Sequence, residues 1–445
     1  MNTFKYWFIF IFSMIVAFSG NSSELAGKLT KITEAYIEHQ MFRGNVLVAI
    51  DDEIIANVSS DNIEFSSRFE IGSIAKQFTA ALIYLLEEKQ LVDFGFPIST
   101  YVKGFSEHEI GTITINEILE HRSGLPRDFI SLNERGTNRN MTSKERLRRL
   151  KDLSISPEKS KQYSNAGFAV ISLIIESVTN KPFEQVLVNN IIKPLNLLNT
   201  GIITEKVKSS LVQGINRLGD DEIVFPSQLQ NYAIGHGAMY SSVMDLYQWQ
   251  LALISGKVVS VKSFNSMLAN NHGLFRYLYN WPSNTGAKGQ AFTHSGSNES
   301  FVANVSTYLD HKLIVVTLAN EKPTYVNSLY NQLANAVLGF DEALPYENLL
   351  DKIATKVLSG DLDGAIKVFS QAKLAQRWDL PSALQLNRYG YLYLENKHFD
   401  SAEKLFDFLT QVYPDYKNGW DSYAEALDAN DNKDKAKKIR QKYLH

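Results

Sequence analysis

Strand-like segments stand at both ends of the first 340 residues and enclose a long helical stretch. Each end holds two short apolar runs separated by a polar turn, which is the pattern of a β-hairpin. The four runs are residues 45–50, 53–58, 301–308 and 313–318. Between them, residues 112–255 alternate helical patterns with loops and are interrupted by prolines. This order predicts an α+β fold in which N- and C-terminal hairpins close one sheet and helices pack on it.

A change of pattern near residue 340 predicts a second domain. Residues 339–345 have the composition of a linker, and the remaining chain is helical throughout. Pairs of matching residues in this tail lie 34 positions apart: Tyr389 and Tyr423, Gly390 and Ala424, and Ala402 and Ala436. Small residues at a fixed period allow the two helices of a hairpin to approach closely. Residues 346–445 therefore resemble a short tetratricopeptide array, a class of repeat that presents a concave groove to peptide partners.

The N-terminus has the features of a secretory signal. Lys5 precedes a short apolar run, and the small residues Ser19 and Gly20 offer a cleavage site. The alternative is an uncleaved anchor, but the apolar run is short for a membrane span. We therefore predict a signal peptide over residues 1–20 and no stable membrane span after its cleavage. The chain has no cysteine, so it needs no disulfides. A periplasmic or secreted bacterial protein fits these features best.

Composition excludes several classes of function. A formal net charge of −3 gives no reason to expect nucleic acid as a partner. The nine histidines are scattered, and the chain contains no H-E-x-x-H pattern and no glycine-rich phosphate loop. We therefore expect no metal and no other cofactor.

One segment pairs a serine with a lysine at the start of an apolar helix. Ser73 follows Gly72, and Lys76 lies three residues later, on the same helical face. A serine hydroxyl becomes nucleophilic when a neighbouring base takes its proton. Lys76 can serve only when it is neutral, which burial or a nearby cation would favour. Ser-x-x-Lys also occurs at Ser156, Ser370 and Ser401, and a capped helix start is the plainer interpretation.

Two further segments offer the groups that such a pair requires. Tyr163 can shuttle a proton, and the Asn165 amide can hold both Lys76 and a substrate carbonyl. His294-Ser295-Gly296 stands just before the penultimate strand pattern, where Gly296 would let a substrate backbone pass closely. The backbone N–H groups of Ser73 and Ser297 would then form an oxyanion hole. Taken singly, each of these segments is more often structural.

In order and context, the three segments resemble the serine beta-lactamase and penicillin-binding protein superfamily. The nearest branch is the group of class C beta-lactamases, D-alanyl-D-alanine carboxypeptidases and esterases. Residues 115–126, 192–195 and 235–246 are similar to further family stretches, and the resemblance covers residues 25–338. It implies a beta-lactamase/transpeptidase-like fold over residues 21–340, in which an antiparallel sheet is flanked by helices and joined by an all-helical subdomain.

The resemblance also implies roles for the site residues. Ser73 would be the acylated nucleophile, Lys76 its base and Tyr163 the proton-transfer partner, while Asn165, His294, Ser295 and Gly296 would bind substrate. His294 stands where most true beta-lactamases have lysine. Histidine is mostly neutral near pH 7, so it provides no permanent cation for a substrate carboxylate. This difference favours ester or peptide hydrolysis.

Three functions remain open from the sequence. The first is a secreted serine hydrolase that acts on a small-molecule or peptide substrate: an ester, an amide or a D-amino-acid peptide. The second is a beta-lactamase or D-Ala-D-Ala carboxypeptidase proper. The third is a non-catalytic ligand-binding or scaffold protein that recruits a protein partner through the helical tail. Substrate choice depends on segments 124–157 and 270–285, which we expect to be irregular loops.

Overall fold

The computed structural model describes residues 23–60, 62–130, 141–219, 221–228, 230–280, 288–340 and 343–443. The predicted signal peptide, residues 1–20, lies outside these ranges. The chain divides into two compact units. The first takes the described residues within Met1–Glu34, Phe42–Gly214 and Phe225–Glu342, and the second those within Ala35–Met41, Ile215–Val224 and Ala343–His445.

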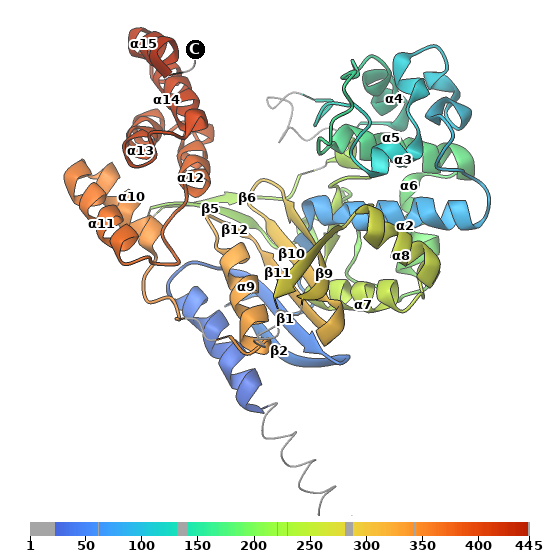
Figure 1. The fold of residues 1–445 in the computed structure, drawn as a ribbon, viewed down its shortest axis with the longest axis horizontal. Helices are drawn as coiled ribbons and strands as arrows, with labels where there is room; N and C mark the ends of the chain where they lie inside the picture. The colour runs from blue at the N-terminus through green and yellow to red at the C-terminus, as the bar shows by residue number, and fades with distance from the viewer. Residues whose placement is uncertain are drawn as a thin grey trace, which may run out of the picture. The chain divides into compact units, whose positions relative to one another are not determined.

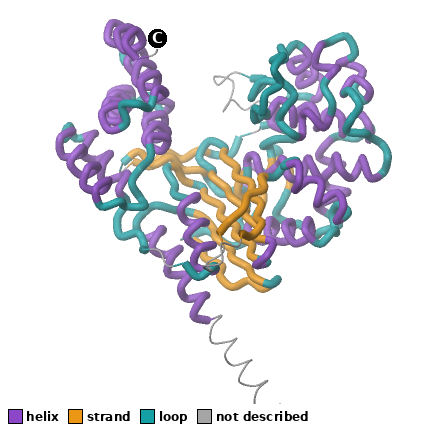
Figure 2. The backbone as a smooth tube through the Cα atoms, in the orientation of Figure 1, coloured by secondary structure: helices purple, strands orange, loops and turns teal. Residues whose placement is uncertain are grey.

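The described residues of the first unit contain a six-stranded antiparallel sheet in the order β2-β1-β11-β10-β9-β8. Its strands are β2 (Glu53–Ser59), β1 (Gly44–Ile50), β11 (Leu313–Ala319), β10 (Val302–Tyr308), β9 (Lys288–Ser297) and β8 (Phe275–Asn280). The two predicted hairpins are confirmed, and they meet where β1 pairs with β11 along their full lengths. Figure 2 shows these strands as one central layer with helices around it.

Both faces of this sheet are covered by helices. In β11 the alternate residues Ile314, Val316 and Leu318 belong to the main hydrophobic core, while the residues between them face the other way. Helix α7 (Val243–Ile254) packs against β11 and β1, and α9 (Val326–Val337) packs against β11 and β10. Figure 1 shows α9 on one side of the sheet, and α7 with α2 (Ala75–Glu88) and α8 (Val261–Asn270) on the other. A further helix spans residues 23–38.

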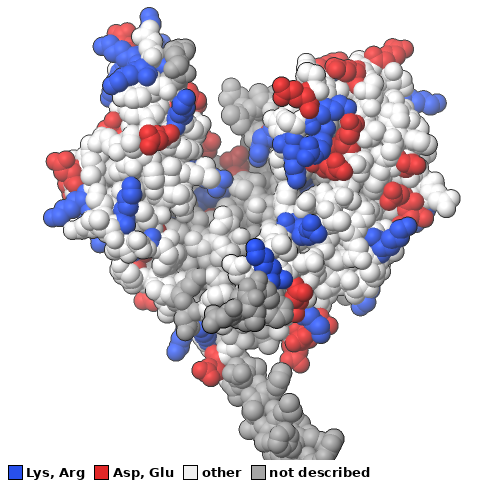
Figure 3. All heavy atoms as spheres, viewed as in Figure 1, with Lys and Arg blue, Asp and Glu red and all other residues white. Residues whose placement is uncertain are grey.

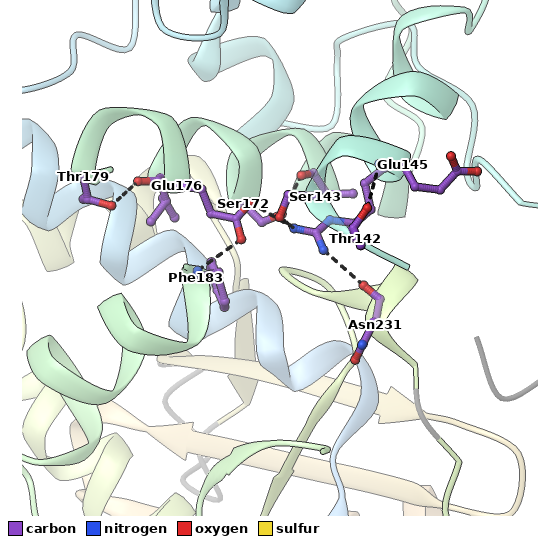
Figure 4. Close-up of polar contacts among 11 residues, drawn as sticks. Thr142, Ser143, Glu145, Ser172, Glu176, Thr179, Phe183 and Asn231 are labelled. Carbon is purple, nitrogen blue, oxygen red and sulfur yellow. Dashed lines mark hydrogen bonds and ion pairs between the residues drawn. The ribbon is translucent and has the colours of Figure 1, made fainter. Parts of the chain in front are cut away.

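The predicted helical subdomain is also present. Its helices are α3 (Ile115–Leu119), α4 (Ser143–Lys151), α5 (Asn165–Thr179) and α6 (Phe183–Leu187). Arg146 of α4 is 1% exposed and pairs with Glu176 of α5 at 3.1 Å. The same guanidinium donates to Ser143 Oγ and to the backbone oxygen of Asn231; Figure 4 shows Ser143, Glu176 and Asn231 in this network. Arg146 thus joins α4 and α5 through its ion pair and links both helices to the segment around Asn231.

A small second sheet supports the start of α2. Its order is β3 (Phe69–Glu70), β7 (Met239–Ser241) and β4 (Gly201–Ile202). Phe69 pairs with Ser241, and the backbone N–H of Ile71 continues the ladder to the oxygen of Met239. The segment that leads into Ser73 is therefore held on a sheet.

Several strands differ from the sequence prediction. Residues 270–285 were expected to form an irregular loop, yet β8 occupies part of that segment. The alternation of apolar and polar residues in β8 is weak because an apolar residue, Leu278, lies on the solvent-facing side of this edge strand and is 60% exposed. Strands β5 (Gly214–Leu218) and β6 (Asp221–Phe225) likewise lie in a stretch expected to be helices and loops. The short strand β12 spans Glu321–Lys322.

The second unit is dominated by helices, which confirms the predicted all-α tail. They are α10 (Leu349–Leu358), α11 (Leu362–Leu374), α12 (Ala383–Glu395), α13 (Phe399–Val412), α14 (Lys417–Ala429) and α15 (Lys433–Tyr443). The small residues at the 34-residue period are buried where neighbouring helices meet. A Cβ atom added to Gly390 would lie 2.5 Å from the ring of Phe406, so α12 and α13 approach too closely there for a side chain. Its resemblance to a tetratricopeptide array stays a prediction.

Two segments from the earlier part of the chain belong to this second unit. Arg217 of β5 contacts the side chain of Gln40 at 2.6 Å and the Asp351 carboxylate of α10 at 3.3 Å. The rings of Tyr36 and Trp378 lie 5.9 Å apart. The unit is therefore built from three parts of the sequence.

Charge and hydropathy add two observations. Basic and acidic side chains are interspersed on the face drawn in Figure 3. Within the described ranges, no helix has the length and apolar character needed to cross a membrane.

Candidate active site

Ser73 lies on a tight turn between β3 and α2. The turn is the 3-10 segment Gly72–Ile74, in which Gly72 has φ +47°. A Cβ atom on Gly72 would lie 2.7 Å from the backbone nitrogen of Ser297, so both the backbone angle and the close neighbour require glycine. This geometry places Ser73 immediately before α2, with Lys76 three residues later in the first turn of that helix.

Lys76 is completely buried beside Ser73. Its Nζ lies 3.1 Å from Ser73 Oγ and 2.9 Å from the backbone oxygen of His236. Burial lowers the pKa of Lys76 well below its usual value, the Arg127 guanidinium lowers it further, and the Asp128 carboxylate opposes this effect. In its neutral form the amine can donate to the backbone oxygen of His236 and accept the serine hydroxyl proton with its lone pair. That is the arrangement a general base requires.

Tyr163 completes the group around Ser73. Its ring centroid lies 4.8 Å from Lys76 Nζ, and its hydroxyl hydrogen-bonds with Ser73. Burial raises the pKa of Tyr163 to about 12, so it is a neutral phenol at physiological pH. The His121 ring packs 4.6 Å from the Tyr163 ring, and Nδ1 of His121 accepts from the backbone N–H of Ser164. Tyr163 is thus fixed and protonated.

Asn165 differs from its predicted arrangement. It is the first residue of α5, and its Nδ2 donates to Asp128 Oδ1 at 2.7 Å. The predicted hydrogen bond between Asn165 and Lys76 is therefore not formed in this structure. An ionised carboxylate is a stronger acceptor for the amide N–H than a neutral amine. Oδ1 of Asn165 is buried and has no hydrogen-bond partner among the described residues.

His294 lies on β9 and is buried and neutral. Burial lowers its pKa to about 3, and Lys76 contributes in the same direction. Its Nδ1 lies 2.7 Å from the backbone oxygen of Ser295, so the ring proton is on Nδ1. The ring of Phe275 packs against it at 5.0 Å. His294 therefore presents no positive charge to a bound molecule.

The end of β9 passes directly against the Ser73 turn. A Cβ atom on Gly296 would lie 1.9 Å from the oxygen of Ile71 and 2.9 Å from the nitrogen of Ser73. The sequence prediction gave Gly296 a role in admitting substrate, whereas here the space that glycine leaves is filled by the backbone of Ile71. The backbone nitrogen of Ser73 thus lies beside Gly296 and that of Ser297 beside Gly72, so the two expected oxyanion donors come from adjoining backbone segments. Ser295 is exposed at the same edge.

Several supporting residues were not identified from sequence. Asp128, His121 and the backbone oxygen of His236 each contact a predicted site residue. All three lie within or next to residues 115–126 and 235–246, which resemble family stretches. That resemblance was the only feature of the sequence that could have identified them. Within the described part of the chain, no group of three or more His, Asp or Glu is placed to hold a metal ion.

Comparison with protein families gives one match over most of the first unit. A family model described as Beta-lactamase matches residues 29–338. Among curated proteins, the chain is 24% identical over 326 residues to Penicillin-binding protein 4* of Bacillus subtilis, covering 66% of this chain and 71% of that protein. It is 28% identical over 247 residues to the putative penicillin-binding protein PbpX of the same organism, covering 52% of this chain and 60% of that protein.

Solved structures support the same fold. D-amino acid amidase from Ochrobactrum anthropi SV3 aligns with a TM-score of 0.61 at 18% identity, covering 71% of this chain and 99% of that one. An octameric penicillin-binding protein homologue from Pyrococcus abyssi gives 0.60 at 21% identity, covering 74% and 81%. A class C beta-lactamase gives 0.59 at 14% identity, covering 73% and 98%.

Proposed function

The chain belongs to the beta-lactamase family and is a serine hydrolase, and we propose that it cleaves an ester, an amide or a D-amino-acid peptide through a Ser73 acyl-enzyme. The observation that carries this proposal is the 3.1 Å contact between Ser73 Oγ and the amine of Lys76, whose pKa is lowered by complete burial. The family model includes all the residues involved.

In the proposed acylation step, Lys76 takes the hydroxyl proton of Ser73 as Oγ attacks the substrate carbonyl. The N–H groups of Ser73 and Ser297 stabilise the oxyanion. Tyr163 then gives its hydroxyl proton to the leaving oxygen or nitrogen and takes the proton that Lys76 holds, so the leaving group departs as an alcohol or amine and both residues return to their starting states. The raised pKa keeps the proton on Tyr163 until the leaving oxygen or nitrogen becomes strongly basic, while the lowered pKa of Lys76 favours the neutral form that a base requires. Water hydrolyses the acyl-enzyme by the same groups in reverse, which releases the acid.

The state of His294 favours substrates that do not depend on a carboxylate. A neutral, buried imidazole provides no fixed cation at the β9 edge of the site. Esters and amides without a terminal carboxylate therefore fit better than penicillins. One of the solved structures of this fold is named as a D-amino acid amidase, and it supports the choice of amides by analogy.

The alternative within the family is a beta-lactamase or a D-Ala-D-Ala carboxypeptidase. The penicillin-binding relatives motivate it. Covalent labelling of Ser73 by a fluorescent penicillin, read by mass spectrometry, would favour this alternative. Good esterase turnover without labelling would exclude it.

The signal-like segment 1–20 supports an extracytoplasmic site of action, periplasmic or secreted. We also propose that the helical tail binds a protein partner through its grooved repeats. A non-catalytic scaffold role for the whole chain is the remaining alternative, and it predicts no turnover of any ester or amide.

The deciding experiment is hydrolysis of a short-chain p-nitrophenyl ester by the purified full chain and by Ser73→Ala. We expect the substitution to lower kcat/KM by at least about a thousandfold, because no other group supplies the nucleophile. Ser156→Ala is the matched control, since it removes the exposed serine of another Ser-x-x-Lys pattern. Equal turnover by Ser73→Ala and the parent chain would reject the proposal.

A further inference from the structure

A buried carboxylate that the proposed chemistry does not use lies three residues before the nucleophile. Glu70 of β3 is 3% exposed. Its Oε2 accepts two hydrogen bonds, from Asn298 Nδ2 at 2.7 Å and from Gln230 Nε2 at 3.1 Å. Burial raises the pKa of Glu70, whereas hydrogen bonds with Ser227, Asn298 and Gln230 lower it. A buried carboxylate is costly without such partners, so these contacts account for its retention inside the protein.

The first of these contacts reaches the oxyanion hole. Asn298 directly follows Ser297, whose N–H is one of the two proposed oxyanion donors. Three contacts hold Asn298. Its side-chain amide donates to Glu70, and its backbone N–H donates to the backbone oxygen of Phe301. Its backbone oxygen accepts from Lys322 Nζ at 2.6 Å. The Ser297 amide is therefore fixed from its C-terminal side, and Glu70 supplies the contact that links it to the Ser73 segment.

The second contact reaches the base. Gln230 opens a turn whose next hydrogen bonds run from Ala233 N–H to Gln230 O and from His236 N–H to Ala233 O. The oxygen of His236 then accepts from Lys76 Nζ at 2.9 Å. Through Gln230, Glu70 is tied to the turn that orients Lys76.

We infer that Glu70 is a positioning residue that holds the nucleophile turn, the oxyanion strand and the Lys76-binding turn in register. It touches neither substrate nor the reacting atoms. It acts through Asn298 on the Ser297 N–H and through Gln230 on the His236 oxygen. The three segments are far apart in sequence, and this one carboxylate oxygen contacts two of them while its backbone belongs to the third. The inference rests on the proposed function, because it assigns Glu70 to the alignment of that site.

The first test replaces the carboxylate by an apolar side chain of similar length, which accepts no hydrogen bond from Asn298 or Gln230. In Glu70→Met we expect kcat for the p-nitrophenyl ester to fall about ten- to a hundredfold, because a displaced oxyanion donor acts on the transition state. KM should stay within about twofold, since ground-state binding does not use the oxyanion charge. Glu299→Gln is the matched control: Glu299 is exposed and acts on Glu70 only through its charge. Its kcat should match that of the parent chain.

The second test exchanges donor and acceptor. Asn298→Asp alone places two carboxylates together and should also lower kcat. In the double variant Glu70→Gln with Asn298→Asp, the new amide can donate to the new carboxylate, so the link is restored with reversed polarity. We expect the double variant to recover at least tenfold in kcat over the weaker single variant. A general loss of stability would not be repaired in this way.

The possible outcomes separate the two proposals. An active parent chain with Glu70→Met equally active, or a double variant no better than the weaker single one, overturns the role of Glu70 alone. A parent chain that neither hydrolyses the ester nor reacts at Ser73 with a p-nitrophenyl phosphonate, read by mass spectrometry, overturns the proposed function as well. Where Glu70→Met does not fold, Asn298→Ala removes the same hydrogen bond from a partly exposed position, and the same loss of kcat is expected.

Discussion

The two compact units fill their interiors in different ways. The first buries charged or ionisable groups, with Glu70, Lys76 and Arg146 at most 3% exposed. At its repeating positions, the second unit packs small residues that let helices approach, such as Gly390 and Ala424. Buried polar groups cost free energy unless they are hydrogen-bonded, so Glu70 and Lys76 beside Ser73 reflect what the proposed site requires, while Arg146 is held by its ion pair with Glu176. In the first unit, substitutions at the site should lower activity without lowering stability, and those at the ion pair should lower stability. In the second unit, substitutions should change stability alone.

The largest effect is expected at Lys76. In Lys76→Met we expect kcat to fall by about a thousandfold or more, because Ser73 loses its base. The free energy of unfolding should not decrease, since an apolar chain of similar length replaces a fully buried amine. Ester turnover and urea denaturation measure the two quantities. In the control Lys159→Met, a surface lysine that pairs with Glu117 is lost and turnover should be unchanged. A large decrease in the free energy of unfolding of Lys76→Met would contradict the prediction that Lys76 is required for activity and not for stability.

The buried ion pair should give the largest loss of stability. Glu176→Gln leaves the Arg146 charge buried without its partner, and we expect the free energy of unfolding to fall by about 3 kcal/mol. Urea denaturation followed by circular dichroism measures this change. Glu145, which is partly exposed and pairs with Arg148 and Arg149, offers the matched control Glu145→Gln, with no measurable change expected. Equal effects from the two substitutions would mean that burial does not decide the strength of these pairs.

The helical unit should respond to packing alone. In Gly390→Ala the new methyl group meets the Phe406 ring, and we expect a loss of about 1–3 kcal/mol in stability with kcat and KM unchanged. Gly27→Ala is the control: nothing lies within 4 Å of the added Cβ, and alanine favours the helix. Thermal unfolding and ester turnover provide the readouts. A change of kcat in Gly390→Ala would show that the second unit influences the site.

How much of the structure the sequence predicts depends on how far apart in the chain the contacting residues lie. The contact between Ser73 and Lys76 could be predicted because residues three positions apart on a helix are neighbours. The hairpins at both ends of the sheet were readable because their strands are local. The Asn165–Asp128 and Glu70–Asn298 contacts join residues 37 and 228 positions apart, so no local pattern contains them. Strand β8 was missed because its exposed face weakens the alternation on which strand prediction depends.

The smallest expected effect is electrostatic tuning at the rim of the site. The Arg127 side chain is 65% exposed, and its charge lowers the pKa of Lys76. Removing that cation in Arg127→Gln stabilises protonated Lys76 and raises its pKa, so the acidic limb of the pH–rate profile should move to higher pH. Solvent screening should keep the shift below about one unit. The exposed Arg122→Gln serves as the control. A profile flat from about pH 6 to 10 in the parent chain would count against Lys76 as the titrating base.

The neighbours of β1 in the sheet have a consequence for synthesis of the chain. One neighbour, β2, begins at Glu53, but the other, β11, begins at Leu313, 263 residues after Ile50 (313 minus 50). At a translation rate of roughly 5–20 residues per second, β11 is made about 13 to 50 seconds after β1. During that interval one edge of an apolar hairpin has no partner, and an open edge is a template for pairing with other chains. Productive synthesis of this protein therefore depends on keeping neighbouring nascent hairpins apart until the last strands arrive.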